Sequence, residues 1–498
     1  MSITVIVQKH SMLVFSVFSV VKNWRLTEMQ VQSMFFKRTA SIKLDDAVLQ
    51  HNMKKARSKF VDGRAKGMLD LDNLEDIRTA AAAIRDRALA NLDAYLIEFE
   101  RNAVRRGAQV HWAETAAEAN RIVLDIARKN HIKKITKSKS MVTEEIGLND
   151  ELAKAGIEVV ETDLGEYILQ LAGEPPSHIV APAMHKSKEQ VADLFVQHHH
   201  KPRLTDISAM TREAREALRG HFLGADMGIS GANFVIAESG TTLTVTNEGN
   251  ADMVTTLPRI HVVVTGIEKV IGTMEDFATL IRLLPRSAVG QSIANYLTLT
   301  TGIKAPDEKE GPEQMHIVFI DAGRTKFVGG ELQPMLRCIR CGACMNHCPV
   351  YQNIGGHAYG WVYPGPMGSI LTPTYVGIEN AGDLPNAATF CGECAVVCPV
   401  KIPLPDLMRK LREKQFDLAL RPWSERMAIR AWGFAVQRPR FYALMSRLGA
   451  RFGAWLGGRK KLIHRLPGLD GWTHGRDMPA PTGKTFRELY RARRAGRA

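Results

Sequence analysis

The segment Cys338-Ile-Arg-Cys341-Gly-Ala-Cys344-Met-Asn-His-Cys348-Pro349 decides how this chain is interpreted. Its spacing is C-x2-C-x2-C-x3-C-P. Three thiolates at such short intervals can bind one cubane cluster, while the fourth, just ahead of a proline, reaches a second cluster. Gly342 permits the backbone to turn tightly between two of these thiolates. The spacing therefore predicts an iron–sulfur site.

A second cysteine group, Cys391-Gly-Glu-Cys394-Ala-Val-Val-Cys398-Pro399, almost repeats the first. When the two C-P ends are aligned, the first position of the second group falls on Ala388, which has no donor atom. In the crossed pattern of two-cluster ferredoxins, the expected ligands of cluster 1 are Cys338, Cys341, Cys344 and Cys398. Those of cluster 2 are Cys348, Cys391 and Cys394. We expect cluster 1 to be [4Fe-4S]. Cluster 2 is expected to be [3Fe-4S], or [4Fe-4S] with a non-cysteine or open fourth site.

All seven cysteines lie between positions 338 and 398, and the first 337 residues contain none. A disulfide framework would spread its cysteines along a small secreted domain, so disulfides are not expected. Structural zinc is the competing metal, but zinc sites usually pair their ligands as two separate C-x2-C groups. The triplet with a following C-P favours iron–sulfur clusters. Clusters that share their motifs must lie close together, which favours electron transfer over a purely structural role.

The region upstream of the cysteines alternates between helical and β-branched stretches, which is typical of an α/β domain over residues 40–325. We expect one long helix over 74–105 and further helices at 113–130, 188–198, 208–222, 274–284 and 291–300. Strands are expected at 157–160, 179–180, 233–237, 241–246, 260–265 and 317–320. The cysteine domain is expected over residues 330–410.

The first 35 residues form an extension that we interpret as disordered, or as preceding the true start at Met29 or Met34. Its apolar run Met12–Val21 is far shorter than the ~20 residues of a membrane-spanning helix. The sequence thus favours a cytoplasmic protein, in agreement with its clustered, unpaired cysteines.

Residues 411–498 are predicted to form a basic, helical C-terminal region. Residues 401–498 contain 23 Lys/Arg against 7 Asp/Glu, whereas the rest of the chain is close to neutral. Phe441, Leu444, Leu448, Phe452 and Trp455 fall on one face of a predicted helix. This apolar stripe would pack on the cysteine domain, or contact an acidic partner or the surface of a membrane.

Three stretches around the cysteines, CIRCGACMNHCPVY, GGHAYGWVYPGPMGSIL and CGECAVVCPVKIPLP, resemble the lactate utilisation protein B family. Upstream, KSKSMVTEEIGLN, GISGANFVIAESGTTL and HVVVTGIEKVI resemble the domain named for lactate utilisation. That domain is distantly similar to sugar-phosphate isomerases and CoA-transferases. The resemblance covers about residues 40–460. It implies an iron–sulfur subunit of a three-component complex that oxidises L-lactate to pyruvate in the cytoplasm, and therefore two partner subunits. It also implies that the two clusters are bound in a helical ferredoxin-like domain.

The resemblance to CoA-transferases makes Glu238, in the segment Glu238-Ser-Gly-Thr-Thr242, a candidate nucleophile, although a turn residue is an equally good interpretation. Glu268 and Lys269 are interpreted as an exposed ion pair. No flavin or nicotinamide site can be assigned, because no convincing G-x-G-x-x-G follows a strand. The chain is thus expected to be a non-catalytic or co-catalytic subunit of the oxidoreductase.

Two other functions compete with electron transfer for lactate oxidation. The α/β domain could act as a free-standing enzyme on a phosphorylated or acyl substrate, with the clusters as auxiliaries. Nucleic-acid binding by the basic tail ranks last, because its arginines flank an amphipathic stripe and match no nucleic-acid motif. A nucleic-acid partner is not expected.

Overall fold

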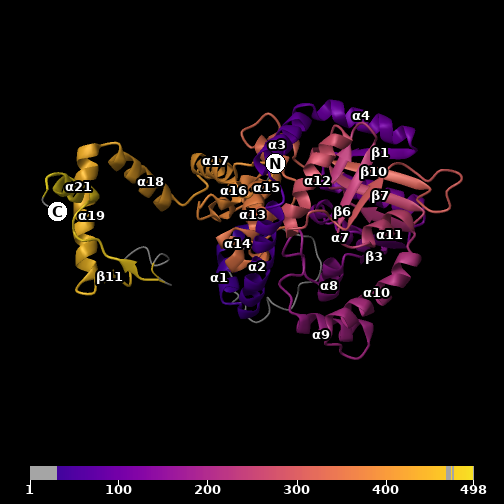
Figure 1. The fold of residues 1–498 in the computed structure, drawn as a ribbon, viewed down its shortest axis with the longest axis horizontal. Coiled ribbons are helices and arrows are strands. Elements are labelled where there is room, and N and C mark those ends of the chain that lie inside the picture. The colour runs from indigo at the N-terminus through magenta and orange to yellow at the C-terminus, as the bar shows by residue number, and fades with distance from the viewer. Residues whose placement is uncertain (1–30, 467–472, 474–475, 497–498) are drawn as a thin grey trace, which may run out of the picture. The chain divides into compact units, whose positions relative to one another are not determined.

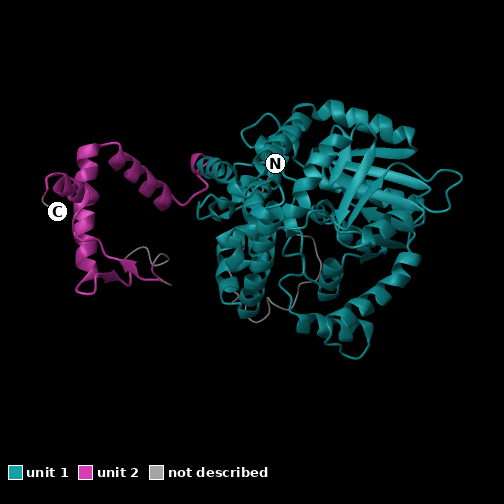
Figure 2. Ribbon diagram, viewed as in Figure 1, with its two compact units in different colours: residues 1–413 teal, residues 414–498 magenta. Residues whose placement is uncertain are grey.

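The computed structural model describes residues 31–466, 473 and 476–496. The chain divides into an N-terminal unit, residues 1–413, and a C-terminal unit, residues 414–498 (Figure 2). The expected N-terminal extension lies outside the described residues apart from residues 31–35. In the described part of the chain, no helix has the length and apolar character that crossing a bilayer requires.

A six-stranded parallel sheet forms the centre of the N-terminal unit (Figure 1). Its strands are β1 Ala108–Ala113, β2 Lys134–Lys137, β3 Glu158–Glu161, β4 Met227–Ser230, β7 Ile260–Gly266 and β10 Gln314–Ile320. Their order is β1-β10-β7-β4-β2-β3, and every neighbouring pair is parallel. All seven residues of β7 are buried, because helices cover both faces of such a sheet and select for apolar, β-branched side chains.

A second, four-stranded sheet lies in the same unit. Its strands are β5 Phe234–Ile236, β6 Thr241–Thr246, β8 Val270–Ile271 and β9 Tyr296–Thr300, in the order β8-β5-β6-β9. The α/β fold class predicted from the sequence is confirmed.

The helix predicted over residues 291–300 is wrong, because residues 296–300 form β9. This strand pairs antiparallel with β6, with Leu299 opposite Leu243. The strand predicted at Ile179–Val180 is also absent, since both residues lie in an irregular loop. The long helix predicted over residues 74–105 is interrupted at Asn91, whose backbone (φ −122°, ψ 33°) is not helical.

Helices surround the parallel sheet (Figure 1). Four of them precede the sheet in the chain, and the others lie between its strands in the sequence. The helices are α1 Phe36–Leu44, α2 Ala47–Met68, α3 Leu74–Ala90, α4 Leu92–Arg105, α5 Ala116–Lys129, α6 Met141–Glu145, α7 Leu148–Lys154, α8 Leu164–Ala172, α9 Lys188–His199, α10 Ile207–Leu223, α11 Asn250–Thr256 and α12 Met274–Val289. Helix α2 lies so close to the end of α12 that a Cβ on Gly67 would come within 2.4 Å of the carbonyl oxygen of Gly290. Glycine at position 67 therefore permits the two helices to approach.

The cysteine region adds short helices joined by tight turns. They are α13 Ala343–Asn346, α14 Pro349–Ile354, α15 Gly365–Tyr375, α16 Glu393–Val396 and α17 Leu404–Asp417. This region shares one hydrophobic core with the N-terminal helices, a core that includes Leu49 and Met53 of α2 together with Tyr351 and Ile354 of α14. The ring of Phe36 also packs edge-on against that of Tyr359, with centroids 5.3 Å apart. The N-terminal helices thus form part of the wall around the cysteines.

Beyond the end of α17, the described residues of the C-terminal unit form helices α18 Trp423–Val436, α19 Pro439–Gly457 and α21 Phe486–Arg494 and the short strands β11 Leu462–Ile463 and β12 Met478–Pro479. The predicted helical character of this region is confirmed. The predicted stripe lies on α19, and its side chains remain 41–73% exposed. Helices α18 and α21 contain no buried residue at all.

Candidate metal centres

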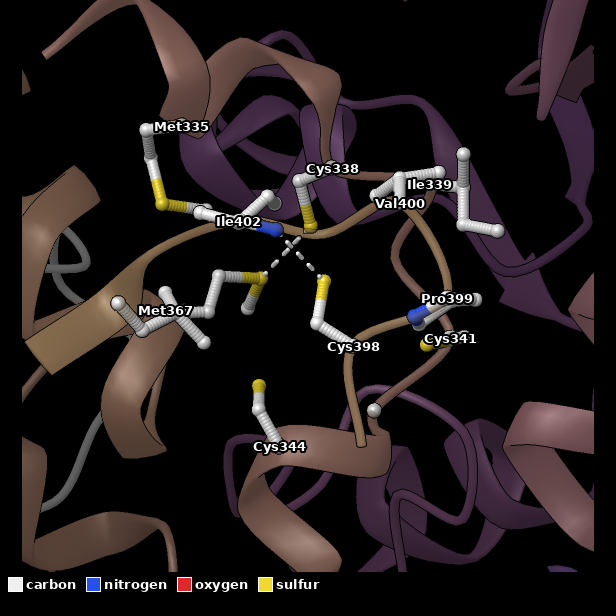
Figure 3. A pocket seen from close by; sticks show the side chains of 12 residues that line it. Met335, Cys338, Ile339, Cys341, Cys344, Met367, Cys398, Pro399, Val400 and Ile402 are labelled. Atoms are coloured by element: carbon white, nitrogen blue, oxygen red, sulfur yellow. Dashed lines mark hydrogen bonds between the residues drawn. The ribbon is translucent and has the colours of Figure 1, made fainter. Parts of the chain in front are cut away.

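Four thiols converge on one cavity in the N-terminal unit, the first centre (Figure 3). They belong to Cys338, Cys341, Cys344 and Cys398. The cavity has a volume of about 350 Å³ and is otherwise lined mainly by apolar side chains, among them Met335, Ile339, Met367, Val400 and Ile402. In Figure 3 the sulfur atoms of Cys338, Cys344 and Cys398 point toward one another. The structure therefore gathers the four residues that the crossed pattern groups as the ligands of cluster 1.

The backbone around the first centre is arranged to direct N–H groups at sulfur. Arg340 and Gly342 both adopt left-handed conformations, with φ 58° and 78°, which bend the chain tightly around the cavity. The N–H of Arg340 donates to Sγ of Cys338 (3.4 Å), and the N–H of Ile402 donates to Sγ of Cys398 (3.3 Å). Such bonds stabilise negative charge on sulfur and influence the potential of a bound cluster.

A second cavity, the second centre, has a volume of about 300 Å³. Its thiols are those of Cys348, Cys391 and Cys394, and Ala388 lines it beside them. The other lining residues include Thr389, Phe390, Pro405 and Met408. No fourth thiol lines this cavity, in agreement with the spacing of the sequence.

The two centres differ in their access to solvent. Cys391, Thr389 and Phe390 are exposed. Each ligand candidate of the first centre, by contrast, is buried or half-buried. The second centre thus lies at the surface of the N-terminal unit, and the first lies deeper.

All seven cysteines are unpaired. Burial raises the pKa of the Cys341, Cys344 and Cys348 thiols, which are therefore hard to ionise without a cation. Burial raises the pKa of Cys394 to about 12 and that of Cys398 to about 11. A metal displaces such protons, because thiolate–metal bonds replace the lost hydration. Three and four thiols around apolar cavities therefore fit iron–sulfur clusters, whose sulfide and thiolate shells need few other polar contacts.

The two histidines near the cysteines hydrogen-bond to the backbone. Nδ1 of His347 lies 2.9 Å from the carbonyl oxygen of Ala343, and Nε2 of His357 lies 2.8 Å from that of Pro175. Both rings thus donate to carbonyl oxygens, and neither lines the two cavities.

Glu238, the candidate nucleophile, lines neither of the two cysteine cavities. Its side chain is exposed, and Oε1 accepts a hydrogen bond from the N–H of Met274 (2.7 Å), the first residue of α12. Its role as a nucleophile stays a prediction, and the geometry is that of a helix-capping group.

The interpretation of Glu268 and Lys269 as an exposed ion pair is wrong. Both residues are buried directly after β7, with 2% and 6% of their surface exposed. Glu268 instead pairs with Arg324, whose Nε lies 2.6 Å from Oε2. The position of Glu268 and Lys269 directly after a mainly apolar strand could have indicated burial, because the carboxyl edge of a parallel sheet faces other elements.

Sequence reasoning also missed two arginines that hold the second cysteine group in place. Nη2 of Arg64, on α2, donates to the carbonyl oxygen of Val397 (3.0 Å). The guanidinium of Arg78, on α3, donates to the carbonyl oxygens of Val396 and Cys398, both at 2.7 Å from Nη2. No local pattern marks these arginines, because their partners lie more than 300 residues away.

Comparison with known proteins agrees with this arrangement. The LUD domain matches residues 96–320, and the 4Fe-4S dicluster domain matches residues 334–402. The family described as lactate utilisation protein B, C-terminal, matches residues 409–495. The lactate utilization protein B of Lysinibacillus sphaericus is 43% identical over 471 residues, which is 94% of this chain and 99% of the relative.

The chain belongs to the lactate utilization protein B family. Two further members show the same coverage. The relative from Bacillus licheniformis is 42% identical over 94% of this chain and 98% of its own. The relative from Bacillus subtilis is 42% identical over 93% of this chain and 97% of its own. This family member is therefore an iron–sulfur protein of lactate utilisation, with an N-terminal LUD domain, a 4Fe-4S dicluster domain and a helical C-terminal region.

Proposed function

We propose that this chain is the electron-transfer subunit of a complex that oxidises L-lactate to pyruvate in the cytoplasm. The observation that carries the proposal is the pair of neighbouring centres, one deep and one at the surface. Cys344 lines the first centre and Cys348 lines the second, and only three residues separate them in the sequence. A bound cluster supplies reversible one-electron transfer.

The residues of this chain have a different task at each centre. At the first, Cys338, Cys341, Cys344 and Cys398 would hold a [4Fe-4S] cluster inside an apolar wall that excludes water. At the second, three thiols would hold a [3Fe-4S] cluster, or a [4Fe-4S] cluster whose fourth iron is not bound by cysteine. The exposed position of Cys391 supports the second centre as the place where electrons pass to or from a partner.

Anaerobic purification together with the two other subunits tests the proposal. Addition of L-lactate should reduce the clusters, as seen by electron paramagnetic resonance, and D-lactate serves as the control. A Cys391→Ser variant should lose transfer through the second centre while the signal of the first centre remains. Clusters that dithionite reduces but that L-lactate never reduces, with all subunits present, would contradict the proposal.

The competing enzyme proposal depends on Glu238. Its carboxylate accepts the N–H of Met274, and Gln would keep an oxygen for this bond, so Glu238→Gln should change little if the residue is structural. A loss of lactate oxidation in Glu238→Gln, with both clusters intact, would favour a catalytic α/β domain over an electron-transfer subunit.

We also propose that the C-terminal unit docks on an acidic surface of a partner subunit. This unit contains 19 Lys/Arg against 5 Asp/Glu, while residues 1–413 have no net charge. It also exposes large aromatic side chains, among them Trp423 and Trp455, each 73% exposed. Charge complementarity and aromatic anchors are typical of such an interface.

Salt and substitution test this docking. Assembly with the partner subunits should weaken as ionic strength rises, and Trp455→Glu should weaken it further at any salt concentration. If neither salt nor Trp455→Glu changes subunit assembly, and the chain sediments with anionic phospholipid vesicles, the proposed docking on a partner subunit is wrong. The C-terminal unit would then bind a membrane surface.

A further inference from the structure

Four cationic side chains and two carboxylates are buried together between the parallel sheet and the first centre. They are Arg85, Lys269, Arg324, Arg340, Glu145 and Glu268. The group therefore has two positive charges in excess. Buried charge without compensation is strongly unfavourable, so an anion close by is required to explain why these cations are buried here.

Arg324 forms ion pairs with both carboxylates of this group, those of Glu145 and Glu268. It is fully buried, and its two terminal nitrogens each lie 2.9 Å from an oxygen of Glu145. Its Nε lies 2.6 Å from Oε2 of Glu268. Tyr363, from the cysteine region, donates its hydroxyl to the same Glu145 (2.5 Å). Arg324, which follows β10, thus ties the carboxyl edge of the sheet to the cysteine region.

Arg85 has only neutral hydrogen-bond partners. Its side chain is 1% exposed and donates to the carbonyl oxygens of Glu268, Val270 (2.9 Å) and Leu336 (3.1 Å). Leu336 comes two residues before Cys338, so this guanidinium spans from the sheet to the start of the first cysteine loop.

Arg340 lies inside the first cysteine loop itself. Its guanidinium stacks on the ring of Tyr363 (4.6 Å to the centroid) and lies 3.3 Å from the sulfur of Met367, which lines the first cavity. Its nearest carboxylate oxygen is Oε1 of Glu268, 3.6 Å away, while Oε2 of the same carboxylate pairs with Arg324. Lys269 is buried and interacts electrostatically with Arg340, Glu268, Cys338 and Arg85. Arg85 and Arg340 therefore contact the first cysteine loop on either side of Cys338, and Lys269 lies within electrostatic range of the same cysteine.

We propose that Arg85, Lys269 and Arg340 balance the charge of the cluster at the first centre and raise its reduction potential. The inference rests on the proposed function, which assigns Cys338 to cluster 1. A four-iron cluster with four thiolates is a dianion when oxidised and a trianion when reduced. Burial opposes the added negative charge, whereas nearby cations stabilise the reduced state more than the oxidised one.

Redox titration of the anaerobic full-length protein at pH 7, followed by electron paramagnetic resonance, tests this inference. Arg340→Gln should lower the ratio of reduced to oxidised cluster 1 at a given potential about tenfold, which is about 59 mV for a one-electron couple. Lys269→Met, which keeps the length of the side chain, should shift the ratio in the same direction. Arg340→Lys keeps the charge and should remain close to the original protein.

Two controls separate a local effect from a general one. Cluster 2 is the internal reference, because Cys338 is assigned to cluster 1 only, and its potential should change much less. Arg121→Gln removes an exposed arginine of α5, paired with Glu118, and should leave both potentials unchanged. If Arg340→Gln loses iron, Lys269→Met decides the question.

An unchanged potential of cluster 1 in both charge-removing variants would overturn the inference, and so would an equal shift of both clusters. Such results would leave the proposed function intact as long as L-lactate still reduces the clusters of the original protein. If the original protein contains no cluster at all, the proposed function and this inference fail together.

Discussion

Arg340 and Phe390 occupy equivalent positions in the two cysteine loops, and their backbones have the same left-handed conformation, with φ 58° and 59°. The glycines that follow the next cysteine, Gly342 and Gly392, also agree, with φ 78° and 86°. The second loop therefore keeps the shape of a cluster-binding loop. What differs is the first position, where Cys338 is replaced by Ala388.

Restoring a thiol at that position should complete the second centre. Ala388→Cys is expected to give a [4Fe-4S] cluster bound by four cysteines, because the loop already has the required backbone and Ala388 lines the cavity. After mild oxidation, the original protein should show the signal of a [3Fe-4S] cluster and the variant should not. Ala388→Ser is the matched control. Identical Mössbauer and paramagnetic spectra for all three proteins would refute the proposed vacancy.

Gly368 is required at the start of α15 for a steric reason. A Cβ at this position would lie 1.5 Å from the carbonyl oxygen of Tyr363, so the turn would have to move. Gly368→Ala should lower the free energy of unfolding by about 1–3 kcal/mol. Gly220→Ala, in α10, meets no atom within 4 Å and should stabilise the protein by roughly 0.5–1 kcal/mol. Equal effects of the two variants in chemical denaturation would contradict this account.

Arg324 is the only cation within ion-pair distance of Glu145 among the described residues. Arg324→Met should therefore destabilise the N-terminal unit by about 3–5 kcal/mol, because both Glu145 and Glu268 lose their closest charge partner. The control Arg121→Met removes an exposed pair and should fall within the error of the measurement. If the two variants unfold at the same temperature, the buried ion pairs of Arg324 do not contribute to stability as proposed.

Stability should fall in mild acid because two histidines are buried in the neutral form. Burial lowers the pKa of His261 and of His178 to about 4 from an ordinary value of 6.5. As the pH falls from 6.5 to 4, the unfolded chain binds protons that the folded chain does not, so stability is lost in that window. At about 1.4 kcal/mol per pKa unit, each histidine contributes on the order of a few kcal/mol. His261→Asn should flatten the curve of unfolding free energy against pH. A slope equal to that of the original protein would refute this role.

The sequence divides the seven cysteines into the same two groups that line the two cavities, because the spacing that groups them is local. The C-x2-C-x2-C-x3-C-P spacing and the position of Ala388 can be read without knowledge of the fold. Among the fully buried strands, β7 was predicted from its run of three valines, whereas β4, with the sequence Met-Gly-Ile-Ser, was missed because it has no continuous apolar run.

Other features depend on partners that are remote in the sequence. Residues 296–300, Tyr-Leu-Thr-Leu-Thr, alternate as a strand does, a local pattern that the predicted helix overlooked, and they pair with the edge of β6. Glu268 and Lys269 look like ordinary surface residues until the cysteine region covers the edge of the sheet. The arginines of α2 and α3 bond to carbonyl groups more than 300 residues away, so their role could not be predicted from the sequence.

The packing of the first helices against the cysteine region has a consequence for how the protein is made. Gln50 of α2 donates to the carbonyl oxygen of Asn353, which is 303 residues further along. A ribosome needs on the order of tens of seconds to synthesise that length of chain. During this interval the apolar face of α2 has left the exit tunnel, but the part of the cysteine region against which it packs has not yet been synthesised. The first centre is also incomplete until Cys398 has been synthesised, so a cluster can be completed there only at the end of translation or after it.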